Sequence, residues 1–234
     1  MANGVDLEKR AAAEAAAQFV LDGMVVGLGT GSTADFAIRV LGERLASGLQ
    51  ITGVPTSRRS AELARECGIP LMDLQSVSRV DVTIDGADEI DQETLALIKG
   101  RGGALVREKL VAVASEFVII VADATKLVER LGCSHAVPVE VLPFGWRLPA
   151  ARISDLGGTV TLRGSSTDSS PFVTDNGNFI LDVEFGAIEQ PAQLAQSIKA
   201  LTGVVDHGLF IDIADRAIVG IAGDVREITS PRRR

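Results

Sequence analysis

The stretch MVVGLGTGST at residues 24–33 joins a short apolar segment to a glycine-rich turn. Residues 24–28 are apolar and few, which predicts a short strand. The turn GTGST at 29–33 follows directly, and residues 34–45 continue as an expected helix. A strand, a tight turn and a helix in this order predict one unit of a parallel α/β sheet.

The same alternation continues outward from this stretch through the first half of the chain. Further helices are expected at 5–21, 57–67 and 104–115, and further strands at 50–54, 80–84, 94–98 and 117–122. Asp22-Gly23 is expected to end the first helix, and Pro55 to break the strand before it. Short β-branched strands that alternate with helices predict a Rossmann-like parallel sheet with helices on both faces.

The pattern changes after about residue 130. Strands are expected at 137–142, 158–162 and 178–185, helices at 147–156 and 191–201, and the longest polar turn at 164–171. Two helices against a mostly antiparallel sheet predict a smaller α+β domain of the ferredoxin-like kind. Strands at 209–213 and 217–221 are expected to return and complete the first sheet.

These patterns predict two domains. Residues 1–130 together with 208–234 form the Rossmann-like domain, and residues 131–207 form an inserted domain. We expect apolar strands exposed on the inserted domain to form a homodimer or homotetramer.

The composition excludes several classes of function. The chain of 234 residues carries 31 acidic and 23 basic residues, a net charge of -8, which argues against a nucleic-acid surface. The only basic cluster is at 232–234, and aromatic residues are 4%. The two cysteines, Cys67 and Cys133, form neither a disulfide framework nor a zinc motif. The apolar run 117–122 is too short for a bilayer, and no secretion signal is recognised, so we expect a cytoplasmic protein that acts on small molecules.

Glycine-rich or polar loops follow four of the expected strands. Their sequences are GTGST at 29–33, DGAD at 85–88, KGRGG at 99–103 and ADATK at 122–126. Ligands bind at the carboxyl ends of the strands in open parallel sheets. We therefore expect these four loops to line one crevice.

The loop GTGST has the composition of an anion site. Gly29 and Gly31 permit close backbone approach, and Ser32 and Thr33 are expected to cap the next helix. The dinucleotide pattern fails because Ser32 occupies the position of the third glycine, and no lysine precedes it as in a Walker motif. A phosphate monoester is the functional interpretation; an ordinary capped turn is the alternative.

The segment DGADEID at 85–91 concentrates carboxylates after a buried strand. Gly86 stands second, which rejects a calcium loop, whereas magnesium held by one or two carboxylates stays open. Asp85 and Asp88 in a cleft would suit proton transfer between hydroxyl groups. The alternative is a solvated acidic turn.

The loop KGRGG and the helix after it supply a cation and a carboxylate. Lys99 is either an anion contact or a solvated lysine. Glu108 shares a helix face with Leu105, Val111 and Ala112, and such apolar surroundings raise a carboxyl pKa toward that of a general base. The alternative for Glu108 is a surface ion pair with Arg107 or Lys109.

Two further kinds of polar residue complete the candidates. Lys126 is either an anion contact beside the same crevice or a surface lysine. The only histidines, His135 and His207, fall in the inserted domain or at its junction, and we interpret them as incidental to the chemistry.

Six segments together resemble the A-type ribose-5-phosphate isomerase family over nearly the whole chain. They are VGLGTGSTA at 26–34, DGADEID at 85–91, KGRGGALVREKLVA at 99–112, ADATK at 122–126, VTDNGNFILDV at 173–183 and TGVVDHGLF at 202–210. The resemblance implies an aldose-ketose isomerase that interconverts D-ribose 5-phosphate and D-ribulose 5-phosphate through a cis-enediolate, without metal or cofactor.

The resemblance also implies a set of site residues. The substrate would be lined by Thr30, Gly31, Ser32, Thr33, Asp85, Gly86, Ala87, Asp88, Lys99, Gly100, Arg101, Gly102 and Lys126. Lys9 would lie near the phosphate. Glu108 would be the catalytic base, Asp85 would open the sugar ring, Lys99 would stabilise the enediolate, and Asp88 would move the hydroxyl proton or orient Lys99.

One position departs from the family pattern. Arg101 replaces a glycine, and if that glycine needs a positive φ the arginine would cost about 1 kcal/mol or more of strain. The alternatives are that Arg101 points outward or adds a phosphate contact.

Two other classes of function remain as alternatives to the isomerase. The first is a non-catalytic sugar-phosphate-binding regulator, which would need neither Glu108 nor Lys99. The second is a nucleotide-binding transferase with magnesium on the segment 85–91.

Overall fold

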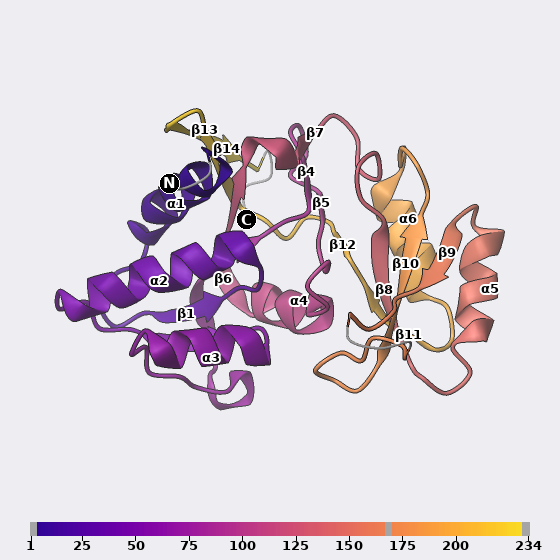
Figure 1. The fold of residues 1–234 in the computed structure, drawn as a ribbon, viewed down its shortest axis with the longest axis horizontal. Helices are drawn as coiled ribbons and strands as arrows, with labels where there is room; N and C mark the ends of the chain where they lie inside the picture. Colours follow the sequence, from indigo (N-terminus) through magenta and orange to yellow (C-terminus); the bar gives the residue numbers. More distant parts are fainter. Residues whose placement is uncertain (1–3, 167–169, 231–234) are drawn as a thin grey trace.

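A computed structural model describes residues 4–166 and 170–230. Its largest element is the central sheet, with strand order β14-β13-β6-β3-β1-β2 (Figure 1). These strands are β1 (Val25–Leu28), β2 (Thr52–Pro55), β3 (Val80–Gly86), β6 (Ser115–Asp123), β13 (Arg216–Ile221) and β14 (Asp224–Thr229). β14 pairs antiparallel with β13, and the other neighbours pair parallel. The predicted mostly parallel α/β sheet is confirmed.

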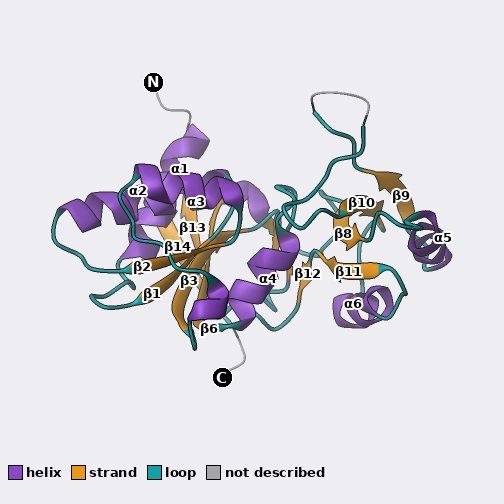
Figure 2. Cartoon of the chain, turned by 90° about the horizontal axis from the view of Figure 1, so that it is seen from below, coloured by secondary structure: helices purple, strands orange, loops and turns teal. Residues whose placement is uncertain are grey.

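Helices cover both faces of the central sheet. They are α1 (Gly4–Ala17), α2 (Ser32–Ala46), α3 (Arg58–Glu66) and α4 (Leu105–Val113). Val82 and Ile84 of β3 pack with α1 and α2 in one core, whereas Val111 of α4 packs against the opposite face (Figure 2). Alternate residues of a strand point to opposite faces, so Thr83 and Asp85 face α4.

The second sheet has the order β11-β8-β10-β9 and pairs antiparallel throughout. It is built from β8 (Val137–Val141), α5 (Arg147–Asp155), β9 (Thr159–Leu162), β10 (Phe179–Glu184), α6 (Pro191–Lys199) and β11 (Val204–His207). Ile153 of α5 and Ile198 of α6 pack with Val139 and Leu181 of the sheet. This βαββαβ order confirms the ferredoxin-like prediction, with β11 as a strand that the sequence pattern did not indicate.

A small sheet lies between the other two and corrects one prediction. It joins β4 (Glu89–Asp91), β5 (Leu97–Ile98), β7 (Leu127–Val128) and β12 (Leu209–Phe210) in the order β12-β5-β4-β7. The expected return of residues 209–213 to the first sheet is therefore wrong, and only the segment at 217–221 joins it. Leu209 and Phe210 are buried in either arrangement, so their apolar character did not identify the partner strand.

Several boundaries differ from the expected ones. The first helix ends at Ala17, before the predicted Asp22-Gly23. Pro55 is the last residue of β2 and does not break it. β3 runs through Gly86, so the segment DGADEID begins inside a strand. Part of the turn predicted at 164–171 and the cluster at 232–234 lie outside the described residues.

Exposed apolar side chains occur on the second sheet's periphery. All of β8 is buried, and none of the large apolar side chains that are exposed among the described residues lies in β8, β9, β10 or β11, so the prediction of exposed apolar strands is wrong. In this part of the chain the exposed ones are Val173, between β9 and β10, and four that lie before, on and just after α5: Leu142, Phe144, Leu148 and Leu156. Phe144 is 95% exposed. Within the described ranges, each helix is too short or too polar to cross a bilayer.

Candidate active site

The four loops predicted to converge do line one cleft at the carboxyl edge of the central sheet. The lining residues are Thr30, Gly31, Ser32, Thr33, Gly86, Ala87, Asp88, Lys99, Gly100, Arg101, Gly102, Glu108 and Lys126. The cleft has a volume of about 270 Å³, just below the usual range for small-molecule sites. This size suits a small metabolite rather than a dinucleotide.

Asp85 stands at the end of β3 with its side chain on the α4 face. Its Oδ1 accepts hydrogen bonds from the backbone N–H groups of Thr30, at 3.0 Å, and Gly86, at 2.7 Å. A Cβ at Gly29 would lie 2.2 Å from this oxygen, so only glycine permits the two strands to approach here. Asp85 is 2% exposed and does not itself line the cleft.

Lys99 is buried between two carboxylates. Its Nζ lies 3.0 Å from Asp85 Oδ2 and 3.3 Å from Glu108 Oε1, and it donates to the carbonyl of Gly86 at 2.5 Å. Its backbone N–H donates to Gly208 at 2.8 Å, which fixes the loop to the small sheet. Both the solvated lysine and the solvated acidic turn are therefore wrong interpretations.

Glu108 lies on the buried face of α4 together with Leu105, Val111 and Ala112, as predicted. The surface ion pair expected as an alternative is wrong, because Arg107 and Lys109 take other partners. Glu108 Oε2 is buried and has no hydrogen-bond partner among the described residues. A buried carboxylate oxygen without a donor is costly, so this atom marks a position for chemistry.

The charges of this cluster shift one another's protonation. Burial raises the pKa of Glu108 to about 8, although Lys99 works in the opposite direction. Burial also raises the pKa of Asp85. Burial alone would lower the pKa of Lys99, but Asp85 and Glu108 together raise it. Lys99 therefore stays cationic while Glu108 exchanges its proton near neutral pH.

The loop at 29–33 leads into the N-terminus of α2. The helix begins at Ser32 with Gly31 as its N-cap, so the prediction that Ser32 and Thr33 cap it is wrong. Gly31 has a φ of 117°, a conformation that favours glycine, and a glycine cap offers no side chain to the first N–H groups of the helix. Gly31, Ser32 and Thr33 all line the cleft. Ser32 accepts a hydrogen bond from Lys9 Nζ at 3.0 Å, so Lys9 stands beside the cleft without lining it.

Arg101 fits its position without backbone strain. Gly100 and Gly103 have positive φ values, and Arg101 does not. Its side chain is exposed, and its N–H donates to Asp88 Oδ2 at 3.0 Å. The expectation that arginine would strain this loop is therefore wrong, because the glycines on either side make the turn.

Of the remaining polar candidates, Lys126 lines the cleft and the two histidines do not. Lys126 ends a short 3₁₀ turn (Ala124–Lys126) and lines the cleft. Neither histidine lines it: His135 Nδ1 lies 3.6 Å from the buried Glu89, and His207 contacts Lys109. Among the described residues, no group of three histidine, cysteine or acidic side chains could hold a metal ion.

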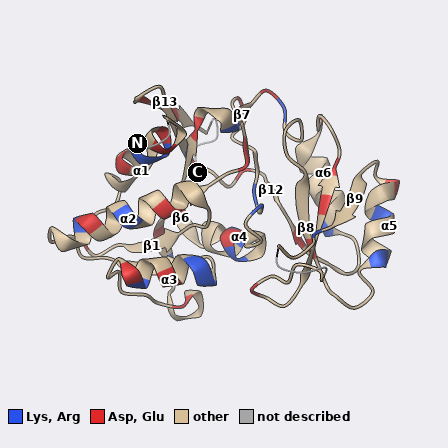
Figure 3. Cartoon of the chain, viewed as in Figure 1, with Lys and Arg blue, Asp and Glu red and all other residues tan. Residues whose placement is uncertain are grey.

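Two hydroxyl residues near the cleft were missed. Thr30 Oγ1 lies 2.8 Å from Thr56 Oγ1 and donates to Ser57 Oγ at 2.7 Å, which fixes the first wall of the cleft. Thr56 and Ser57 follow β2, so the expectation that ligands bind at the carboxyl ends of parallel strands applies to them as well. In Figure 3, basic and acidic positions are interspersed along α2, α3 and α4.

The fold and the cleft together define an α/β enzyme of the proton-transfer class. A parallel sheet supplies the carboxyl-edge cleft, α2 supplies a helix N-terminus for an anion, and a buried lysine lies between two carboxylates.

The chain belongs to the ribose 5-phosphate isomerase A family. The model of that family, ribose 5-phosphate isomerase A (phosphoriboisomerase A), matches residues 52–223. The ribose-5-phosphate isomerase A of Thermomicrobium roseum is 55% identical over 229 residues, covering 98% of this chain and 96% of that protein. The Gloeobacter violaceus protein of the same name is 52% identical over 225 residues, covering 96% and 97%.

Solved structures agree with this assignment. Ribose 5-phosphate isomerase A from Methanocaldococcus jannaschii matches with a TM-score of 0.92 at 40% identity, covering 96% of this chain and 99% of that one. A D-ribose-5-phosphate isomerase in complex with phospho-erythronic acid matches with a TM-score of 0.94 at 41% identity, covering 96% and 99%. The resemblance stated from the six segments is confirmed.

Proposed function

We propose that this chain interconverts D-ribose 5-phosphate and D-ribulose 5-phosphate through a cis-enediolate. The observation that carries the proposal is Glu108, a residue of the cleft lining whose Oε1 lies 3.3 Å from the Lys99 ammonium and whose buried Oε2 has no hydrogen-bond partner among the described residues. Isomerisation needs a base that takes one carbon-bound proton and a cation that stabilises the oxyanion formed.

In our proposal the phosphate binds at the N-terminus of α2. Ser32 and Thr33 form the first turn of that helix, whose free N–H groups favour an anion. Lys9 at Ser32 and Lys126 across the cleft supply the local positive charge. These contacts would overcome the repulsion from the net charge of -8 at close range.

The carbon chemistry falls to Glu108 and Lys99. Glu108 takes the proton from C2 of the open-chain aldose, and the electron pair of that C–H bond forms the C1–C2 double bond of the enediolate. Lys99 stabilises the negative oxygen, which is typically worth about 3 kcal/mol in a site shielded from water. Glu108 then returns the same proton to C1, and no electron acceptor or metal takes part.

We assign ring opening to Asp85 and the proton transfer between O1 and O2 to Asp88. Ribulose 5-phosphate cannot close a furanose ring because its C5 oxygen carries the phosphate, so its enolisation needs no ring opening. Asp85→Asn should therefore slow conversion of ribose 5-phosphate but retain deuterium exchange at C1 of ribulose 5-phosphate, whereas Asp88→Asn should impair both. Equal loss of both reactions in Asp85→Asn would contradict this division.

We further propose the domain division 1–130 with 208–234, and 131–207 inserted. The exposed side chains around α5 support an apolar interface of the inserted domain, so we propose a homodimer or homotetramer. Light scattering coupled to size exclusion tests this, and a monomer at micromolar concentration contradicts it. We propose a cytoplasmic location because phosphorylated sugars do not cross bilayers unaided.

The decisive experiment follows conversion of ribose 5-phosphate by the metal-free protein, with and without EDTA. Equal turnover in both conditions is expected. A magnesium-dependent transferase would instead lose its activity in EDTA, and a non-catalytic regulator would bind the sugar phosphate without converting it. No observation favours the non-catalytic regulator, because binding a sugar phosphate does not require a buried lysine beside a buried carboxylate.

A further inference from the structure

The loop between β5 and α4 depends on the second sheet for its shape. Gly103 N–H donates to the carbonyl of Gly100 at 2.9 Å, so residues 100–103 form a β-turn. The two central residues, Arg101 and Gly102, line the cleft. The conformation of this turn therefore sets one wall of the substrate site.

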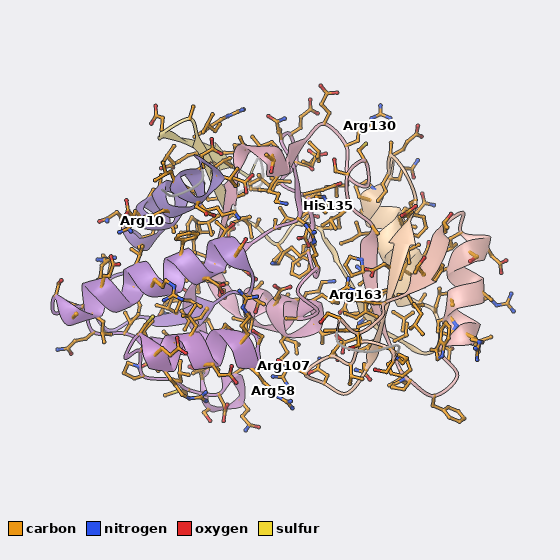
Figure 4. All side chains as sticks on the ribbon, viewed as in Figure 1. Arg10, Arg58, Arg107, Arg130, His135 and Arg163 are labelled. Carbon is orange, nitrogen blue, oxygen red and sulfur yellow. The ribbon has the colours of Figure 1, made fainter. Side chains whose placement is uncertain are left out.

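Arg163, just after β9, contacts this turn without itself lining the cleft. Its Nη1 donates to the carbonyls of Gly100 and Arg101, both at 3.1 Å. Its Nε donates to Asp182 Oδ2 at 2.8 Å, and its Nη2 donates to Asp182 Oδ1. One guanidinium thus joins a carboxylate of β10 to two carbonyls of the turn. Figure 4 labels Arg163 on the side of the second sheet that faces the central sheet.

The position of Arg163 is itself fixed by the second sheet. Its backbone N–H donates to Ile180 and its carbonyl accepts from Phe172, both at 2.8 Å. The side chain is 15% exposed, so its planar fork is held in one geometry. A lysine would present its three N–H donors from one nitrogen, so it could not reproduce the spacing of the guanidinium donors that face the carboxylate and the two carbonyls.

Phe172 provides a second contact to the same turn. A Cβ at Gly103 would lie 2.5 Å from Phe172 Cζ, so the ring packs directly on this glycine. The guanidinium of Arg163 lies 5.8 Å from the centroid of the same ring. The turn is therefore held by a polar and an apolar contact that both come from the segment joining β9 to β10.

We propose that Arg163 is a positioning residue for substrate binding, which acts through the β-turn at 100–103. It holds the carbonyls of the turn, and the turn in return directs the Arg101 N–H to Asp88. The inference rests on the proposed isomerase function. It assigns to the second sheet a part in forming the active site as well as in assembly.

The test compares steady-state kinetics with ribose 5-phosphate for the wild type, Arg163→Ala and Arg163→Lys. Arg163→Ala should raise KM about tenfold and lower kcat less than about threefold, because a charged donor to two carbonyls is lost while Lys99 and Glu108 keep their partners. Arg163→Lys should raise KM by an intermediate factor. The pH at which kcat/KM falls by half should not move.

Arg152→Ala is the matched control, since Arg152 lies on α5 of the same sheet and pairs with Asp155 at the surface. Its KM should equal that of the wild type. A merely structural role of Arg163 would reduce the folded fraction, and hence kcat, at unchanged KM, and that result would overturn the proposal.

If Arg163→Ala does not fold, the same kinetics are measured with Asp182→Asn. This variant removes the carboxylate that holds Arg163 and should raise KM about threefold. An unchanged KM would again overturn the proposal. An inactive wild type would instead reject the proposed function. In that case calorimetric titration of wild type and Arg163→Ala with phospho-erythronic acid tests Arg163 alone, and about tenfold weaker binding is expected.

Discussion

Two neighbouring residues of α4, Glu108 and Lys109, belong to two different buried charge clusters. The clusters differ in whether all their carboxylate oxygens have hydrogen-bond donors. Glu108 faces the cleft and meets Lys99 and Asp85, whereas Lys109 faces β11 and meets Asp206. Both lysines lie over the ring of Phe210, at 5.4 Å for Lys99 and 4.8 Å for Lys109. The same aromatic ring therefore separates the candidate active site from the junction to the second sheet.

In the Lys109 cluster both oxygens of the carboxylate have donors. Lys109 Nζ donates to Asp206 Oδ1 and to the carbonyl of His207, both at 2.6 Å, and Lys199 reaches the other carboxylate oxygen at 3.0 Å. Burial works to raise the pKa of Asp206, but Lys109, the His207 N–H and Lys199 together outweigh it and the pKa is lowered. Burial lowers the pKa of Lys109 and that of His207, the latter to about 4.

The Lys99 cluster carries one cation for two carboxylates and leaves an oxygen of Glu108 without a donor. Burial of such an excess charge costs several kcal/mol and is retained only where it serves a purpose. This difference supports the proposal that the Lys109 cluster stabilises the junction and the Lys99 cluster beside the cleft carries the chemistry.

Glu108→Gln gives the sharpest contrast between the clusters. Removing the base should lower kcat about 10³-fold, within the usual range for general-base catalysis, with little change in substrate binding. At pH 9 the folded wild type carries a buried, ionised Glu108, which burial disfavours. The glutamine amide does not ionise, so the variant should be more stable than the wild type at that pH. Stopped assays and thermal unfolding measure both effects, and near-normal kcat would refute the role as base.

Lys109→Met should have the opposite outcome. The partly exposed Asp206 would lose its nearest cation but keep Lys199, so we expect a loss of about 2 kcal/mol in the free energy of unfolding. The kcat/KM of the folded protein should change less than about threefold, because no reacting atom is touched. Urea unfolding and steady-state kinetics test this prediction. A loss of activity like that of Glu108→Gln would contradict it, because it would show that the Lys109 cluster is also needed for catalysis.

The pH dependence of kcat/KM tests the role of Glu108 in the Lys99 cluster without a mutation. The base must be ionised, and the pKa of Glu108 is raised to about 8, so kcat/KM should fall about tenfold per pH unit below that value. The raised pKa also means that its contribution to stability, present below about pH 4.5, is lost as the pH rises through about 8. A flat kcat/KM between pH 6 and 9 would contradict the assignment.

Lys126→Ala should affect substrate binding alone. Lys126 is half-buried and lines the cleft outside both clusters, and losing the phosphate contact proposed for it should raise KM about tenfold with kcat almost unchanged. Initial rates over a range of ribose 5-phosphate concentrations measure it. An unchanged KM would remove Lys126 from the phosphate site.

The amino-acid sequence by itself determined the α/β sheet, the ferredoxin-like insertion and the loops that meet in the cleft. Hydrophobic periodicity and glycine turns are local signals, and the parallel strands β1, β3 and β6 bring their carboxyl ends to one edge. The loop at 99–103 reaches the cleft by another route, because β5 lies in the small sheet and pairs antiparallel with β4 and β12. A strand was predicted at 209–213, but its partner was not predictable, because a buried apolar pair fits several sheets equally well.

Only the tertiary structure decided between the alternatives for individual charges. Glu108, Arg107 and Lys109 are consecutive, and local sequence permits pairing among them. Packing of α4 between two sheets turns Glu108 to Lys99 and Lys109 to Asp206, and sends Arg107 to the loop at Asp175. The reason is physical: burial and charge pairing depend on what surrounds a side chain in space, and those neighbours come from residues distant in sequence.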